Sequence, residues 1–170
     1  DRKPAVQIIV RDITERKRAE EELRASERRT SEIVDNAPFG AHLYELGSER
    51  RLVFSGANRA ADSILGVSHQ QFVGKTIEEA FPSLSQTDIP DAYRRVAATG
   101  EHYDVDQVDY ADGGIRGAFE VHAFQTGPNR MATFFRDVTE RKRAEQALRQ
   151  SEQTARRMAE QLRVVNQIGV

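Results

Sequence analysis

Residues 131–145 read MATFFRDVTERKRAE, and the sequence changes character in the middle of this stretch. Its first five residues are mostly apolar or aromatic and include no Gly or Pro, which predicts a strand. After Asp137 the chain is rich in Glu, Arg, Lys, Gln and Ala and meets no Gly or Pro before Gly169, which predicts a long helix. Asp137 is a typical N-cap residue, and Glu140 can close a capping box three positions later. The stretch therefore predicts a last strand that is coupled rigidly to an outgoing helix.

A second copy of this stretch lies near the start of the chain. Residues 11–27 and 136–152 are identical at 13 of 17 positions and lie 125 residues apart. A period of that length is too long for a solenoid repeat and indicates a tandem array of domains that each end in this junction. Residues 1–12 are then the remnant of the last strand of a preceding domain. We expect signal transmission at both junctions, through Asp137, Thr139, Glu140, Asp12, Thr14 and Glu15.

Composition limits the classes of protein to which the chain can belong. With 170 residues, 38% hydrophobic and 31% charged, it has room for one domain and solvated extensions. No apolar run approaches the ~20 residues of a membrane span, and the start, which lacks Met, has no apolar region of a signal peptide. The absence of cysteine excludes disulfides and thiolate metal sites. We therefore expect a fragment of a longer cytoplasmic protein, and the net charge of −2 argues against a nucleic-acid partner.

Two long helices are expected on either side of a globular unit. They span residues 13–35 and 138–165, at about 34 Å and about 42 Å in length. Apolar and small residues recur in both at alternating spacings of four and three, which is a heptad seam. The shared register favours a parallel dimeric coiled coil; the alternative is that each helix packs on its own domain. The expected dimer seam comprises Leu23, Ile33, Ala144, Leu148, Ala155, Met158 and Leu162. Residues 13–35 would be a linker helix and residues 138–170 a signalling helix.

The unit between these helices, residues 36–137, shows strand and helix patterns in a definite order. The Pro and Gly of residues 36–40 end the first helix. Two strands in a hairpin are expected next, then short helices that begin at Asn58, Ser68 and Thr76, then one longer helix, and finally three strands. The expected strands are 41–46, 52–55, 102–110, 115–125 and 130–136, and the longer helix is 88–98. Strands at both ends with helices between them predict an α+β domain whose antiparallel sheet is covered on one face.

Motifs along this unit resemble those of PAS domains. The core of the resemblance is NRAA at 58–61, LGVS at 65–68, FVGK at 72–75 and FP at 81–82. NAPFG at 36–40 resembles the opening of such domains, and FFRDVTER at 134–141 resembles their Asp-x-Thr exit into a signalling helix. The resemblance covers residues 28–145, with a truncated exit at 1–27. It implies a five-stranded PAS fold, a cavity between sheet and helices, and a sensing or dimerising role in a larger regulator, such as a sensor histidine kinase of a two-component system, a cyclic-dinucleotide enzyme or a phosphatase.

Departures from known PAS subclasses bear on the ligand. Flavin-binding photosensory members form a Cys adduct, and members with a thioester-linked chromophore also need Cys, which this chain lacks. Many haem-binding members carry a ligating His on the longer helix, where residues 88–98 contain none. We therefore expect no covalently bound cofactor and no haem, which leaves a small apolar or aromatic ligand or none. The pocket candidates are Phe72, Phe81, Tyr93, Val96, Phe119, Val121 and Phe135, and the alternative is that they simply form a filled core.

The remaining chemistry-bearing residues show no catalytic pattern. His69 and His102 fall near element starts, where we expect them to be solvated, and His42 and His122 lie on predicted strands. No two histidines have metal-ligand spacing, and the chain has neither a nucleophile elbow nor a phosphate loop, so we expect no catalysis and no metal site here. The sequence thus predicts a sensory module that passes a ligand- or partner-induced change to a downstream effector. The alternatives are a ligand-free dimerisation and relay module or a protein-interaction module.

Overall fold

The structure is a computed structural model that describes residues 14–168, and it divides after Asn36 into two units, which we describe separately. In the first unit, α1 (Thr14–Asp35) forms the predicted first helix of 22 residues. Its side chains from Glu15 to Ile33 are exposed, and Arg16 pairs with Glu20 at 3.2 Å, one turn away. Residues 1–12, for which we predicted the remnant of a strand, lie outside the described part of the chain.

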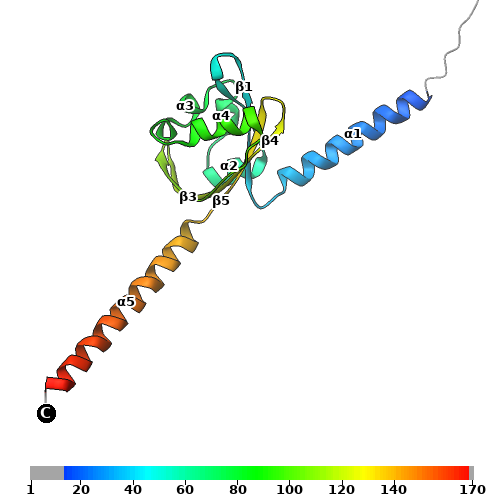
Figure 1. Ribbon diagram of the computed structural model, residues 1–170. Helices are drawn as coiled ribbons and strands as arrows, with labels where there is room; N and C mark the ends of the chain where they lie inside the picture. Colours follow the sequence, from blue (N-terminus) through cyan, green and yellow to red (C-terminus); the bar gives the residue numbers. More distant parts are fainter. Residues whose placement is uncertain (1–13, 169–170) are drawn as a thin grey trace, which may run out of the picture. The chain divides into compact units, whose positions relative to one another are not determined.

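The second unit is built on a five-stranded antiparallel sheet with the strand order β2-β1-β5-β4-β3 (Figure 1). The strands are β1 (Gly40–Leu46), β2 (Leu52–Ala57), β3 (Tyr103–Asp112), β4 (Ile115–Gly127) and β5 (Arg130–Asp137). The predicted hairpin of the first two strands and the predicted run of three final strands are both present. Because β5 pairs with β1 and with β4, the last strand lies at the centre of the sheet. The sequence-based prediction of an α+β fold is confirmed.

Short helical segments connect the two groups of strands. They are η1 (Ser48–Arg50), α2 (Arg59–Leu65), η2 (His69–Phe72), α3 (Ile77–Ala80), η3 (Pro82–Gln86) and the longer α4 (Ile89–Thr99). Asn58 caps α2 by accepting from the Ala61 N–H, and Thr76 forms a capping box with Glu79. Ser68, which we expected to cap the next segment, makes no side-chain cap bond, because the short η2 is held instead by a bond from its first N–H to Asp62.

The core lies between the sheet and the helices. Its largest fully buried side chains include Tyr44, Phe54 and Met131 from the sheet and Val96 from α4. Alternate residues of each strand face the helices, as the period-2 geometry of strands requires. Helix α4 contacts β1, β4 and β5, and α2 contacts β1. Aromatic side chains dominate this layer, so the packing geometry of their rings determines how much space stays unfilled.

The second unit continues into α5 (Thr139–Ile168), a helix of 30 residues that extends three residues beyond the predicted end. Its described side chains after Lys142 are exposed. No helix within residues 14–168 is both long and apolar enough to cross a membrane.

Candidate functional site: an apolar cavity and the joint to the last helix

A cavity of about 70 Å³ lies between the sheet and the helices. Five of the seven predicted pocket residues line it, namely Phe81, Tyr93, Phe119, Val121 and Phe135. The other two do not. Val96 is buried in the core, and Phe72 is partly buried, with its ring 5.2 Å from that of Phe81. The space equals the liquid volume of about two waters, so a molecule of a few heavy atoms fits it without rearrangement.

Polar side chains that sequence reasoning did not select also line the cavity, and among them are His42, Tyr44, Tyr110 and Thr133. The Tyr93 hydroxyl lies 3.2 Å from Thr133 Oγ1, which joins α4 to the central strand β5. Burial raises the pKa of Tyr93, and burial with the nearby carboxylate of Asp112 raises the pKa of Tyr110 to about 12. Both phenols therefore remain neutral near pH 7. The cavity is apolar with a few hydrogen-bonding groups in its wall, as small-molecule sites are.

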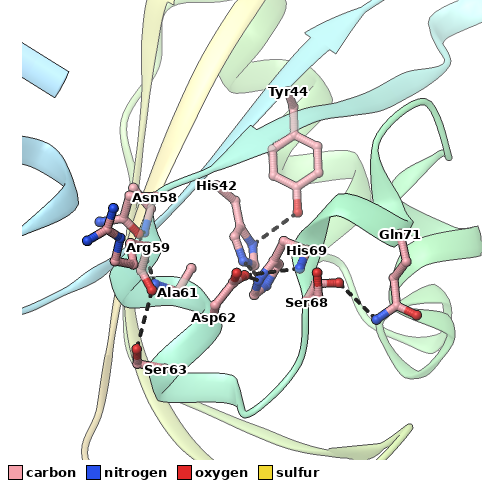
Figure 2. A network of polar contacts seen from close by, with 11 residues as sticks. His42, Tyr44, Asn58, Arg59, Ala61, Asp62, Ser63, Ser68, His69 and Gln71 are labelled. Atoms are coloured by element: carbon pink, nitrogen blue, oxygen red, sulfur yellow. Dashed lines mark hydrogen bonds and ion pairs between the residues drawn. The ribbon is translucent and has the colours of Figure 1, made fainter. Parts of the chain in front are cut away.

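A chain of four polar side chains, which we call the histidine relay, leads into one wall of the cavity: Asp62, His69, His42 and Tyr44 (Figure 2). Asp62 Oδ1 lies 2.5 Å from His69 Nδ1. His69 Nε2 lies 2.9 Å from His42 Nε2. His42 Nδ1 lies 3.5 Å from the Tyr44 hydroxyl oxygen. The relay thus runs from α2 through η2 into β1, and its last two members line the cavity.

Burial sets the electrostatics of the relay. Burial, with a smaller contribution from His69, lowers the pKa of His42 well below its ordinary value, so this imidazole is neutral near pH 7. Burial raises the pKa of Asp62, but hydrogen bonds from the backbone and ring of His69 outweigh that effect and leave the pKa lowered. Asp62 is therefore a carboxylate, and its side chain remains 48% exposed. The inner end of the relay is dry and the outer end is in contact with water.

The expectation that His69 is solvated is wrong, because its side chain is only 3% exposed. The bond from its backbone N–H to Asp62 Oδ1, at 3.0 Å, turns η2 back against α2 and directs the ring inward. His102 is exposed as expected, and His122 pairs on the surface with Asp104 at 2.8 Å. The sequence holds no signal for the contact of His42 with His69, since 27 residues separate them and only the tertiary fold joins them.

Asn58, in the NRAA motif, connects the start of β1 to α2. Its Oδ1 accepts from the N–H groups of Ala41 at 2.8 Å and Ala61 at 3.0 Å. Its Nδ2 donates to the carbonyl of Phe39 at 3.0 Å. The side chain is 5% exposed, so these bonds replace water and fix the edge of the cavity wall that carries His42.

The joint between β5 and α5 is held by three hydrogen bonds. Asp137 Oδ1 accepts from the Thr139 N–H at 2.8 Å. Thr139 Oγ1 in turn accepts from the Ala118 N–H at 2.9 Å, and the Val138 N–H donates to the Ala118 carbonyl at 2.8 Å. Gly117 lets these groups approach closely, since a Cβ there would lie 3.0 Å from Thr139 Oγ1 and from the ring of Phe119. The first residue of the helix is therefore bonded to β4 as well as to β5.

Glu140 does not close the capping box that we expected. Its Oε1 accepts from Arg143 Nη1 at 2.9 Å, one turn along the exposed face of α5. The N–H of Asp137 lies within the ladder in which Asp137 pairs with Phe119, so the backbone there is part of the sheet. Asp137 nevertheless supplies the predicted side-chain bond to the first turn of the helix. In the other copy, Asp12 and the side chain of Thr14 lie outside the described residues, and Glu15 is exposed in α1.

The predicted seam residues of the long helices are exposed wherever they are described. Leu148 and Met158 of α5 are 61% and 59% exposed, and Leu23 and Ile33 of α1 are 59% and 66% exposed. Ala144 and Ala155 are exposed as well, and the side chain of Leu162 lies outside the described residues. Each helix therefore presents large apolar side chains that its own unit does not cover. The assignment of these residues to a dimer seam stays a prediction.

Metal chemistry has no visible basis in the described part of the chain. Within residues 14–168, no three His, Asp or Glu side chains form a group that could hold a metal ion. The polar groups that the fold does bring together, in the histidine relay, are already hydrogen-bonded to one another. What the arrangement can do is hold a small, mostly apolar molecule against a polar wall.

The fold and the site together define a class of protein: a small α+β module whose sheet and short helices enclose a cavity and whose last strand continues into a long helix. A family model described as PAS fold matches residues 34–143, which is more than half of the chain. The chain therefore belongs to the PAS fold family.

Similar proteins come from bacteria and archaea. Sporulation kinase E of Bacillus subtilis (strain 168) is 30% identical over 155 residues, which cover 85% of this chain and 19% of that kinase. A solved domain of the sensory box sensor histidine kinase/response regulator of Geobacter sulfurreducens has a TM-score of 0.54 at 13% identity, over 68% of this chain and 96% of that one. The PAS domain of an HTR-like protein from Haloarcula marismortui has a TM-score of 0.52 at 17% identity, over 67% and 98%. The two solved structures support the fold. The chain spans about a fifth of the length of the kinase.

Proposed function

We propose that this chain is a sensory module of a larger signalling protein, in which occupancy of the cavity changes the position or stability of α5. The change would pass through the joint of Asp137, Thr139 and Ala118 to an effector domain such as a histidine kinase. Two facts support the proposal: membership of a family of sensory domains and the 30% identity to part of Sporulation kinase E. Within the described residues, the fold forms a cavity and does not bring catalytic side chains together.

The observation that carries the proposal is the short distance along the chain between the cavity wall and the helix joint. Phe119 lines the cavity, and its neighbour Ala118 makes both bonds to the start of α5. Phe135 also lines the cavity and stands two residues before Asp137 on the same strand. A ligand that displaces either ring strains a strand whose next residues anchor the helix. Such a ligand shifts the equilibrium only if it binds the two helix arrangements with different affinity.

Dimerisation through the long helices would convert this strain into an output. The exposed Leu148 and Met158 stand ten residues apart in α5, in the heptad seam predicted from the sequence. Ala and Ser dilute this seam, so a coiled coil built on it would be marginal, and small forces from the joint could shift its packing. A homodimer with one effector per chain is the assembly that we propose.

The test is native mass spectrometry of the chain beside extraction under denaturing conditions. Sensing predicts that the native mass spectrum shows a small molecule bound to the folded dimer and that the same molecule is recovered in the denatured extract. Added small molecules should also raise the melting temperature, because a ligand that binds only the folded state stabilises it. An intact dimer that retains nothing and responds to no member of a ligand panel would contradict sensing and favour a ligand-free relay.

A protein-interaction module is the second candidate, and the outer face of the sheet favours it. Leu43 there is 44% exposed, and the Phe134 ring contacts those of Phe39 and Phe124 at centroid distances of 4.5 and 4.9 Å. This candidate predicts a chain that is monomeric alone and loses a partner when Leu43→Glu is introduced. The sensory proposal predicts no change in dimerisation for that variant.

A further inference from the structure

The histidine relay connects the cavity to a second hollow on the surface. The surface hollow has a volume of about 300 Å³ and is lined by Asp62 and His69 together with Ser55 and Gln70. The inner cavity is lined by the other two members, His42 and Tyr44. The relay therefore connects the surface hollow to the apolar cavity, and Figure 2 shows its members in contact from α2 to β1.

The proton positions at the outer end follow from the charge of Asp62. As a carboxylate it can only accept, so His69 carries its proton at Nδ1, 2.5 Å away. The two Nε2 atoms of His69 and His42 then face each other at 2.9 Å with one proton between them. If His69 is neutral, His42 donates from Nε2. If His69 holds a second proton, His69 donates and His42 accepts.

These alternatives fix the tautomer of His42, because a neutral imidazole carries one proton. When His42 donates from Nε2, its Nδ1 is a bare acceptor for the Tyr44 hydroxyl, and the Tyr44 oxygen can accept from a ligand. When His42 accepts at Nε2, its proton is at Nδ1 and points toward the Tyr44 oxygen, 3.5 Å away. The Tyr44 hydroxyl proton is then free to be donated into the cavity.

We propose that one proton, held or released by the His69–Asp62 pair, decides whether the cavity wall offers a ligand an acceptor or a donor. The protonated relay binds small molecules with a carbonyl-type acceptor, and the deprotonated relay disfavours them. This inference rests on the proposed function, since it assumes that the cavity takes ligands. The proton balance is simple: one proton comes from water, the Nε2 proton of His42 passes to His69, and His42 gains a proton at Nδ1.

The surroundings of the relay support this location of the charge. The titratable groups that face His69 and His42 are Asp62 from α2 and Tyr44 from β1. The phenylalanine rings around them are those of Phe54, Phe72, Phe81 and Phe135. Farther along the cavity wall stand the neutral phenols of Tyr93 and Tyr110. Lys75 lies over Phe72, with Nζ 5.7 Å from the ring centre. Asp62 is thus the one carboxylate among these groups, and it contacts His69 rather than His42.

Nitrogen-15 NMR of the histidine side chains of the 170-residue chain tests the proposal without any ligand. Long-range proton–nitrogen spectra distinguish the two tautomers and the imidazolium. In a titration from about pH 8 to about pH 5, the proposal requires His42 to change from the Nε2–H to the Nδ1–H tautomer in the same step in which His69 gains its second proton. A His42 that keeps one tautomer throughout, or that itself becomes the imidazolium, would overturn the proposal.

The variant Asp62→Asn keeps an acceptor for His69 but removes the negative charge. The tautomer change of His42 should then occur at a lower pH, since the carboxylate beside His69 favours the protonated form of the imidazole. The matched control is Asp104→Asn, which removes the carboxylate from the exposed His122 pair and should leave the His42 tautomer curve unchanged. Equal midpoints in Asp62→Asn and the unmodified chain would overturn the proposal. Retained dispersion of the amide spectrum shows that each variant is folded.

Acetone, whose carbonyl can only accept, is the probe for the ligand class. Its affinity is measured by chemical-shift titration. As the pH is lowered toward the midpoint of the tautomer change, the affinity should rise about tenfold per pH unit, because one proton is taken up per ligand, and below the midpoint it should level off. Absence of binding at pH 5, or equal affinity at pH 5 and pH 8, would overturn the ligand assignment. The two hypotheses are separable, because the tautomer change does not need a natural ligand and the mass spectrometry test of the proposed function does not depend on pH.

Discussion

Thr139 Oγ1 accepts a hydrogen bond of 2.9 Å from the backbone N–H of Ala118. Thr139 is the first residue of α5, and Ala118 lies near the start of β4, so this hydroxyl joins the start of the helix to a strand other than the one it follows. Ala118 precedes Phe119 of the cavity wall. The last helix is therefore not tethered by the covalent chain alone.

Thr139→Val should loosen this joint while the sheet remains intact. The substitution keeps the shape but leaves the Ala118 N–H without its acceptor, at a cost of about 1–3 kcal/mol. Amide hydrogen exchange should become faster at Ala118 and in the first turn of α5. The matched control is Thr154→Val, because the Thr154 hydroxyl bonds only to the Gln150 carbonyl within the same helix, at 2.8 Å. Equal protection of Ala118 in both variants would contradict the role of Thr139.

Asp137→Ala should uncouple the cavity from the effector in the full-length protein without unfolding the domain. It removes the bond of 2.8 Å to the Thr139 N–H, and the loss of such a helix cap costs about 1 kcal/mol. Asp137→Asn retains the accepting oxygen and should retain the response. The measurement is effector output with and without stimulus, beside the melting temperature. A lower melting temperature with unchanged signalling would show that Asp137 only stabilises the fold.

Insertions in α5 test whether output depends on helix phase. Two residues inserted after Leu148 would rotate Met158 away from the seam, whereas seven inserted residues restore it. The short insertion should therefore alter output strongly and the long one only slightly. Similar effects of both insertions would argue against a register-dependent relay. Sedimentation of each variant reports whether the dimer persists.

Asn58→Ala should be among the most destabilising polar substitutions in the domain. It removes bonds to Ala41, Ala61 and Phe39 from a side chain that is 5% exposed, so buried partners lose their hydrogen bonds at a cost of about 2–4 kcal/mol in total. The melting temperature should fall by roughly 4–8 °C for each kcal/mol of stability lost in a domain of this size. Asn58→Asp keeps the acceptor of two of these bonds, so its melting temperature should fall less than that of Asn58→Ala. A loss below 1 °C for Asn58→Ala would contradict this account.

The stability of the domain should decrease as the pH falls below about 6.5, the ordinary pKa of histidine. Burial lowers the pKa of His42 in the folded state, so the unfolded chain binds one more proton than the folded chain does in this range. One such proton makes the free energy of unfolding fall by up to about 1.4 kcal/mol per pH unit. The free energy of unfolding, measured with denaturant, should differ less between pH 7 and pH 5 in His42→Phe than in the unmodified chain. An equal difference in both proteins would exclude His42 as its source.

Local patterns were sufficient for most of the secondary structure. The strand that contains Met131–Phe135 and the long helix after it follow from residues that are adjacent in sequence, since strand period and helix propensity act over a few positions. The caps at Asn58 and Thr76 were predictable for the same reason. Ser68 was misread because a competing bond from the His69 N–H to Asp62, seven residues away, fixed that turn instead.

The candidate site was only partly visible in the sequence. Apolar and aromatic residues at core positions predicted five members of the cavity wall, because such side chains are buried together between sheet and helices. Phe72 and Val96 have the same chemistry but lie away from the free space. The histidines escaped prediction because a strand His and a His near a helix start show no shared pattern.

The sequence by itself determined the order of the elements, the ends of most of them and the family, because each depends on patterns of residues that are a few positions apart. The copied junction at residues 11–27 stays a prediction. Only the tertiary structure decided that the Ala118 N–H bonds to Thr139, that His42 contacts His69, and that a cavity of about 70 Å³ remains between the sheet and the helices. These features depend on strand register and on how rings pack across 20 to 40 residues of chain. A shift of one position in β1, for example, would turn His42 to the opposite face of the sheet and away from His69.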